Sequence, residues 1–317
     1  MRVLIVATCL VASLHAHASG RIELWVRSAG TYGGAATPQF VGTAVDLADL
    51  TPTEIEADDL QFRSREKFRG VPIQELWENF AVPLECDGAV LHFRNGMAVT
   101  YPFRDRAVVA RLGLFVATAI WEASAESGNW SSSFPTASRG ATDSHPVFFE
   151  GNKVVSKTRW HPSVRTKAAD EFSPWEYIDN LTGVEFVRMS AYWDQFRVGD
   201  ATATKGLELF RERCNFCHGV RGVGARYGWD YVTPLPVYQQ RDPDSLLLHL
   251  KYRPLDGSTR GPKMPVFKDA TLSEARALHA WMRAVSEHAL REYLPIDFSR
   301  SALRLAPTGP STRQRTN

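Results

Sequence analysis

The stretch AVLHFRNGMAVTYP, residues 89–102, gives the clearest indication of the fold in the first half of this sequence. Apolar and polar side chains alternate on both sides of Asn95-Gly96, as they do in strands that bury one face. Asn and Gly both tolerate the positive φ angles of a tight turn, so the stretch predicts a β-hairpin. The segment RIELWV (21–26) alternates in the same way and predicts a further strand.

Around these strands the sequence suggests a mainly β, mixed α/β domain over residues 19–198. IQELWENF (73–80) has the apolar spacing of a helix. Residues 121–165 are rich in Ser, Gly, Thr and Pro and are expected to form a long loop.

A shift in composition near residues 195–202, where RVGDATAT (197–204) follows an aromatic-rich stretch, predicts a second domain over residues 199–292. Helical spacing is found at 204–214, 243–252 and 271–290, and Thr271 with Glu274 forms a capping box at the start of the last helix. The tail, 293–317, has little apolar content, and we expect it to be disordered.

The N-terminus predicts export. Arg2 precedes an apolar run at 3–14, and Ala16 and Ala18 form a small-residue cleavage site, so residues 1–18 are typical of a secretory signal peptide. The alternative is a buried N-terminal strand or helix. We expect a periplasmic protein without a membrane span, since no later stretch has 18 uninterrupted apolar residues. A net charge of +2 argues against a nucleic-acid binder.

The four cysteines then divide by role. Cys9 leaves with the signal peptide, Cys86 stands alone, and Cys214 and Cys217 belong to the string CNFCH. A thioredoxin-like pair would follow a strand, and a structural zinc site would need a second ligand pair; neither is found in the sequence. Covalent haem attachment explains the string best, with His218 placed as an iron ligand.

A second iron ligand is predicted at Met264, in GPKMPVF (261–267). Pro265 keeps Met264 out of a helix, so that the thioether can project from a fixed loop. His249 is the fallback ligand.

Residues 203–288 resemble the class I cytochrome c family. Gly206 and Phe210 fit its first helix, and Leu278 and Trp281 fit its last, which crosses the first closely. The resemblance implies an all-α domain that carries single electrons and is not an enzyme. It also suggests that the carbonyl of Pro234 accepts a hydrogen bond from His218.

The expected partners are therefore redox proteins of the periplasm, a dehydrogenase as donor and a respiratory component as acceptor. Residues 201–290 contain 13 Lys+Arg against 9 Asp+Glu. This small excess of positive charge is consistent with docking onto acidic partners, and equally with charges spread over a solvent-exposed surface.

The first domain is similar to short proteins related to the molybdopterin-binding fold of sulfite oxidases. The segments that carry this resemblance are VDLADL (45–50), FRGVPIQELWENF (68–80), GAVLHFRNGMAVTYPFRD (88–105) and PWEYIDNLTGVEFV (174–187). Because the short relatives commonly lack the cofactor, we expect a docking or recognition domain without molybdopterin. The predicted fold class is therefore α+β, a mainly β domain followed by an all-α cytochrome c domain.

The alternative is a two-domain molybdenum-pterin oxidoreductase with a fused haem acceptor. Its metal would need a thiolate, and Cys86 lies between Glu85 and Asp87, which disfavour ionisation of the thiol. Arginines in the same domain could form an anion site or simply be surface charges: Arg104, Arg106 and Arg111.

Aromatic side chains and two histidines complete the candidates. The tryptophans are expected to pack the interface between the domains: Trp121, Trp130, Trp160, Trp175 and Trp193. His145 and His161 could bind a metal but have no further ligands nearby in the sequence.

Overall fold

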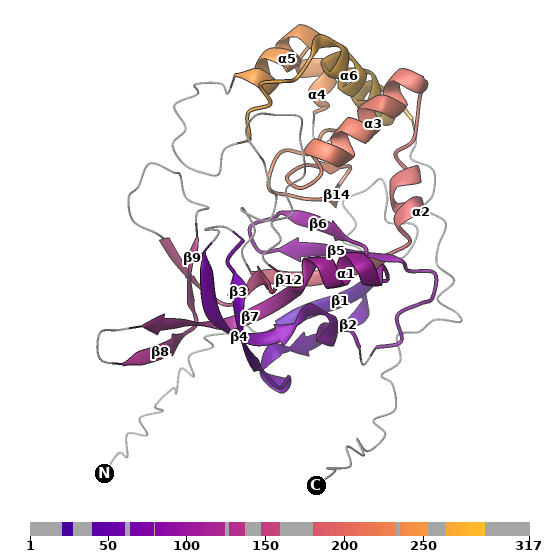
Figure 1. Cartoon of the computed structure of the whole chain (residues 1–317). Coiled ribbons are helices and arrows are strands. Elements are labelled where there is room, and N and C mark those ends of the chain that lie inside the picture. The colour runs from indigo at the N-terminus through magenta and orange to yellow at the C-terminus, as the bar shows by residue number, and fades with distance from the viewer. Residues whose placement is uncertain are drawn as a thin grey trace, which may run out of the picture.

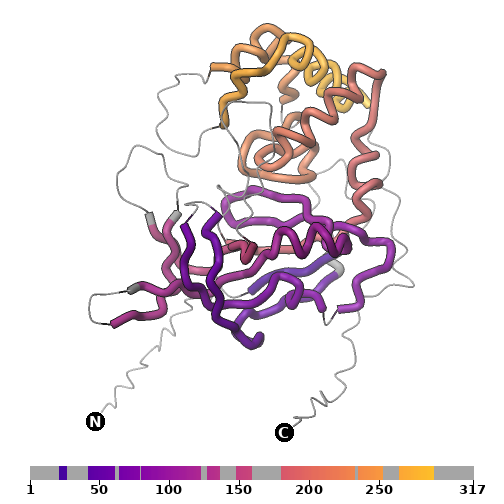
Figure 2. The backbone as a smooth tube through the Cα atoms, in the orientation of Figure 1, coloured from indigo at the N-terminus to yellow at the C-terminus, as the bar shows by residue number. Residues whose placement is uncertain are grey.

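The computed structural model describes residues 21–27, 40–60, 64–78, 80–123, 127–136, 147–158, 180–232, 235–252 and 264–288. The predicted signal peptide, residues 1–18, and the predicted tail, residues 293–317, lie outside these ranges. Figures 1 and 2 show most strands gathered in one body, with the C-terminal helices together on one side of it.

The first sheet has five strands in the order β2-β1-β12-β5-β6. β1 (Arg21–Arg27) and β12 (Leu181–Val187) run parallel, although nearly half of the chain separates them. The other neighbours are antiparallel, and the other strands are β2 (Phe40–Asp46), β5 (Gly88–Phe93) and β6 (Ala98–Tyr101). The predicted hairpin and the predicted strand at 21–26 are confirmed, and Gly96 adopts a φ of +89° at the hairpin turn.

The second sheet has the order β11-β3-β4-β7-β8, and β11 also pairs with β7. Four strands therefore close on one another. The strands are β3 (Thr53–Asp58), β4 (Arg65–Pro72), β7 (Leu114–Ala123), β8 (Gly128–Ser131) and β11 (Lys153–Ser156). β9 (Ser133–Thr136) and β10 (Val147–Glu150) form a separate pair.

The expected long loop at 121–165 is therefore wrong over its described part, which contains β8 to β11. These strands are only four residues long, and their composition is that of a loop. Pairing decides their conformation: β11 pairs with β7, and Val154 and Val155 are fully buried. Burial against a neighbouring strand overrides weak local preference.

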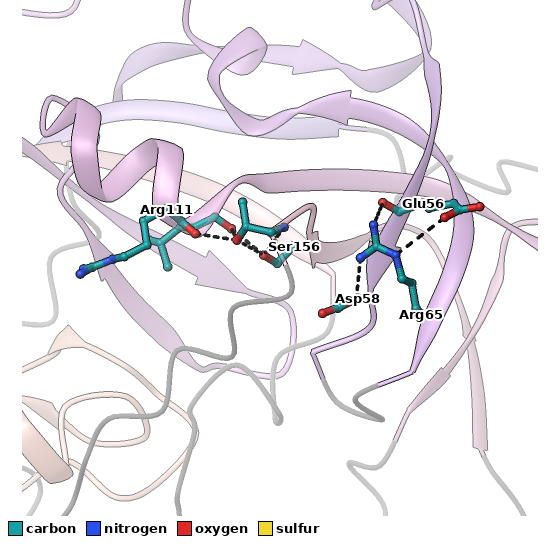
Figure 3. A network of polar contacts seen from close by, with 7 residues as sticks. Glu56, Asp58, Arg65, Arg111 and Ser156 are labelled. Carbon is teal, nitrogen blue, oxygen red and sulfur yellow. Dashed lines mark hydrogen bonds and ion pairs between the residues drawn. The ribbon is translucent and has the colours of Figure 1, made fainter.

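Buried polar contacts hold the ends of the second sheet (Figure 3). Arg65 donates to the carboxylate of the buried Asp58 at 2.9 Å and to the carbonyl of Glu56 at 3.1 Å. Ser156 Oγ donates to the carbonyl of Leu112 at 2.6 Å. These bonds satisfy polar groups that the closed strands remove from water.

The helices are mostly short. They are α1 (Arg106–Leu112), α2 (Met189–Asp194), α3 (Ala201–Arg213), α4 (Val237–Gln240), α5 (Pro243–Lys251) and α6 (Leu272–Glu287), with 3₁₀ turns at Leu47–Asp49 and Ile73–Leu76. The three helices predicted from residue 204 onward are confirmed, as is the capping box of α6. At 73–80 the structure has the 3₁₀ turn and no α-helix. Across the described ranges, no helix has the length and apolar character needed to span a bilayer.

The predicted fold class is wrong. Over the described residues the chain is mostly β-sheet, in four sheets with a few helices, and no all-α cytochrome c domain is evident in the described part after residue 199. The part after residue 199 itself contains a two-stranded sheet, β13 (Gly219–Val220) with β14 (Val223–Gly224). Its helices also share one hydrophobic cluster with strand residues Val90, Ala98 and Val187. Helical spacing predicts local elements, but it does not reveal that their apolar faces pack onto a sheet.

Candidate functional site

The CNFCH string lies where α3 ends. The helix begins at Asp200, whose side chain accepts from the amide of Ala203 at 2.9 Å. Beyond its last residue, the amides of Cys217 and His218 both donate to the carbonyl of Cys214, at 3.2 and 2.9 Å. This tight turn brings two thiols and an imidazole onto one short piece of chain.

The close crossing of α3 and α6 supports the turn from behind. A Cβ at Gly206 would lie 2.7 Å from the Cβ of Trp281 and would also collide with the carbonyl of Ala277. The rings of Phe210 and Trp281 pack with centroids 4.7 Å apart, and Leu278 is buried beside them. The four residues expected at a helix crossing are therefore brought together there.

One cavity joins the turn to Met264. Its lining includes Cys214, Cys217, His218, Tyr231 and Met264. Met264 comes from the far side of α5 in the sequence, so the fold brings it to the string. The structure thus places together all four residues expected to attach and ligate a haem, and the donor set of two thiols, an imidazole and a thioether fits that group.

His218 is held by the main chain of a following loop. Its Nδ1 donates to the carbonyl of Trp229 at 2.7 Å. A Cβ at Gly228 would lie 2.7 Å from this Nδ1, so only glycine leaves room for the ring. Pro234, the expected acceptor, lies outside the described residues.

Burial dominates the electrostatics of the ring. It lowers the pKa of His218, while the Trp229 carbonyl and the nearby Asp230 act in the opposite direction. The imidazole is therefore favoured in its neutral form, with the proton on Nδ1 and Nε2 free to act as a ligand.

The two thiols are also shielded from water. Burial raises the pKa of Cys214 to about 11 and that of Cys217 to about 12. The hydroxyl of Tyr231 is hydrogen-bonded to Cys214, which partly opposes the shift. A reactive redox pair has a thiol of lowered pKa, and neither thiol here fits that description.

A buried cation lies next to the first thiol. Arg213 is 9% exposed, and its guanidinium lies 3.4 Å from Asp269 and 3.5 Å from Glu274. These contacts tie the end of α3 to the start of α6. Sequence reasoning missed Arg213 and Tyr231; a basic residue directly before the first cysteine was the available signal for Arg213.

The fallback ligand His249 sits on α5, half-buried. Among the described residues, its Nδ1 has no hydrogen-bond partner. Burial lowers the pKa of His249, and Arg241 and His218 lower it further. Met264 lines the cavity of the thiols and His249 does not.

The remaining candidates lie apart from this cavity. Cys86 is fully buried, and burial followed by the charges of Glu85 and Asp87 raises its pKa to about 12, with Arg104 opposing. The guanidinium of Arg104 donates to main-chain carbonyls, among them that of Cys86, so it serves the backbone. A protonated, buried thiol is poorly suited to bind a metal as thiolate.

The three described tryptophans of the predicted set do not form one interface. Trp193 packs in the core shared by helices and sheet, whereas Trp121 and Trp130 pair on β7 and β8, with Lys67 over both rings. Four aromatic or histidine candidates lie outside the described residues: His145, Trp160, His161 and Trp175.

A comparison of the chain with protein-family models, with curated proteins and with solved structures finds no match.

Proposed function

We propose that this chain is a c-type cytochrome that carries single electrons through one haem attached at Cys214 and Cys217. The observation that supports this most is the shared cavity, because Met264 joins Cys214, Cys217 and His218 there from a separate part of the chain. A bound haem supplies reversible one-electron chemistry at its iron.

Each residue of the chain then has a defined task. Cys214 and Cys217 would hold the group through thioether bonds, and His218 and Met264 would supply the two protein ligands. The hydrogen bond from His218 Nδ1 to Trp229 fixes the tautomer that leaves Nε2 unprotonated. With both ligands coming from the protein, the chain would act as a carrier and not as an enzyme.

An exposed aromatic side chain beside the site supports a protein partner. Trp229, whose carbonyl accepts the hydrogen bond from His218, is 76% exposed. Tryptophan is enriched at protein interfaces. We propose a periplasmic dehydrogenase as donor and a respiratory acceptor, with residues 1–18 as the export signal; these proposals rest on the sequence.

The test is the mass and metal content of the exported protein. The chain would be produced in a host that makes both haem c and molybdopterin, and intact mass, iron and molybdenum would be measured together. We expect the added mass of one haem and a single iron atom per chain, with molybdenum at background.

Cysteine variants make the test specific. Cys214→Ala and Cys217→Ala should each lose a covalent link to haem, while Cys86→Ala serves as the matched control and should keep both. An exported chain without covalently bound haem would contradict the proposal. Molybdenum in equal amount with iron would favour an oxidoreductase instead.

A further inference from the structure

The CNFCH string contacts the first sheet at its outermost strand. β6 is the last strand in the sheet order, so among the described residues one of its edges has no strand partner. The amide of Ala98 on that edge donates to the carbonyl of Phe216 at 3.1 Å. The string therefore covers a sheet edge that would otherwise expose unpaired main-chain groups.

The side chain of Phe216 deepens this contact. Phe216 is the second residue between the two cysteines, and it is only 7% exposed. It belongs to the core cluster of the first sheet, together with Met97 and Val99, and Cys217 and Tyr227 pack against the same cluster. An apolar anchor within the string is thus buried in the β part of the molecule.

The turn of the β5–β6 hairpin makes the second contact. The carbonyl of Gly96 accepts from the amide of Arg226 at 2.6 Å. A Cβ at Gly96 would lie 3.0 Å from both the carbonyl carbon of Arg226 and the amide nitrogen of Tyr227. The main chain of the hairpin turn therefore packs directly on the main chain of residues 226–227. Figure 1 shows β14 between α3 and β6, where the helices meet the first sheet.

The loop touched by this turn also holds the imidazole. The amide of Gly228 donates to the carbonyl of Cys217 at 2.6 Å, and the next carbonyl, that of Trp229, accepts from His218 Nδ1 at 2.7 Å. A Cβ at Gly228 would lie 2.5 Å from Cε1 of the ring. Residues 226–229 are consequently wedged between the hairpin turn and the ring of His218.

We propose that the β5–β6 hairpin is the positioning element for His218, with Gly96 and Phe216 as its positioning residues. The hairpin sets the place of residues 226–229, and these residues set the orientation and the hydrogen bond of the imidazole. Through this hairpin, the first sheet affects the orientation of the imidazole. The importance of this positioning for an iron ligand rests on the proposed function. The effect of the hairpin on the imidazole ring does not depend on that function.

The experiment compares two glycine variants in the full chain. Gly96→Ala places a methyl group against Arg226 and Tyr227, whereas Gly222→Ala places one where nothing lies within 4 Å. Both glycines have positive φ, +89° and +76°, so both variants place alanine in a conformation that favours glycine, and the methyl contact with Arg226 and Tyr227 is made in one of them. The primary measurement is NMR of the histidine rings, with His218 assigned from a His218→Asn variant.

We expect Gly96→Ala to shift the His218 ring resonances and to speed solvent exchange of its Nδ1 proton by about fivefold to tenfold, as for a weakened hydrogen bond. Gly222→Ala should leave both unchanged. Equal effects of the two variants, or no effect of either, would overturn the proposal. Should Gly96→Ala fail to fold, Phe216→Leu decides, and unchanged His218 resonances in that variant would overturn it.

The haem potential provides a second readout. A weaker bond from Nδ1 makes the imidazole a poorer electron donor to ferric iron, so Gly96→Ala should raise the reduction potential relative to both the parent and Gly222→Ala. If the parent carries no haem, the proposed function fails, and the NMR comparison still tests the positioning role.

Discussion

Replacing Gly206 with alanine tests the packing behind the site. The added methyl would lie 2.7 Å from the Cβ of Trp281 and 2.1 Å from the carbonyl oxygen of Ala277. Ordinary contact begins at 3.4 Å, so the closer of these contacts requires α3 and α6 to separate by about 1.3 Å. Overpacking of this kind costs about 1–3 kcal/mol, while alanine gains about 1 kcal/mol over glycine within a helix. Because the carbonyl of Ala277 is also in the way and cannot rotate aside, we expect a net loss of about 1–2 kcal/mol in the free energy of unfolding.

Urea unfolding followed by tryptophan fluorescence measures this loss. Lys205→Ala is the control, since Lys205 is exposed on the same helix and its replacement should fall within about 0.5 kcal/mol of the parent. If Gly206→Ala were as stable as the parent or more stable, the helices would not be in the close contact described, and the reasoning would be refuted.

Two further predictions concern buried groups of the β-sheets. Asp59→Ala should lower the free energy of unfolding by about 3–5 kcal/mol, because the buried ammonium of Lys153, which lies 2.5 Å from Asp59, loses its carboxylate. Glu54→Ala is the control: it breaks an exposed pair with Lys67 and should change the urea midpoint little. Cys86, whose pKa is raised to about 12 in the folded chain, should make stability fall as pH rises above about 9, where the thiol ionises only in the unfolded chain. This one thiol should contribute about 1.4 kcal/mol per pH unit, so the pH slope should be smaller by that amount in Cys86→Ala, and equal pH slopes in the two proteins would contradict it.

Local patterns predicted the local elements well. The Asn-Gly turn predicted the β5–β6 hairpin, and the capping box predicted where α6 begins, because in both cases the residues that decide the conformation are neighbours in the chain. The same reasoning went wrong at residues 128–156, where four-residue strands depend on distant partners. It also went wrong on the fold class, because the helices bury their apolar faces partly against Val90, Ala98 and Val187 of the sheet.

The candidate site divides in the same way. The spacing in CNFCH identifies Cys214, Cys217 and His218, since neighbouring residues in a turn must lie together. The sequence also suggested Met264, from its proline, but only the fold could place it at the same cavity. The acceptor for His218 Nδ1 could not be identified from the sequence. It is a main-chain carbonyl, which every residue has, so no residue type marks its position.

By itself the sequence determined the chemistry available here: two thiols, an imidazole and a thioether, and the short elements that carry them. The tertiary structure alone decided that Phe216 is buried in the core of the first sheet and that the turn at Gly96 presses on the loop that holds His218. It also decided that β1 pairs with β12, although nearly half of the chain separates the two strands. The physical reason is that these contacts form between segments far apart in sequence, where burial of apolar surface and pairing of main-chain groups select the partner and no local preference does.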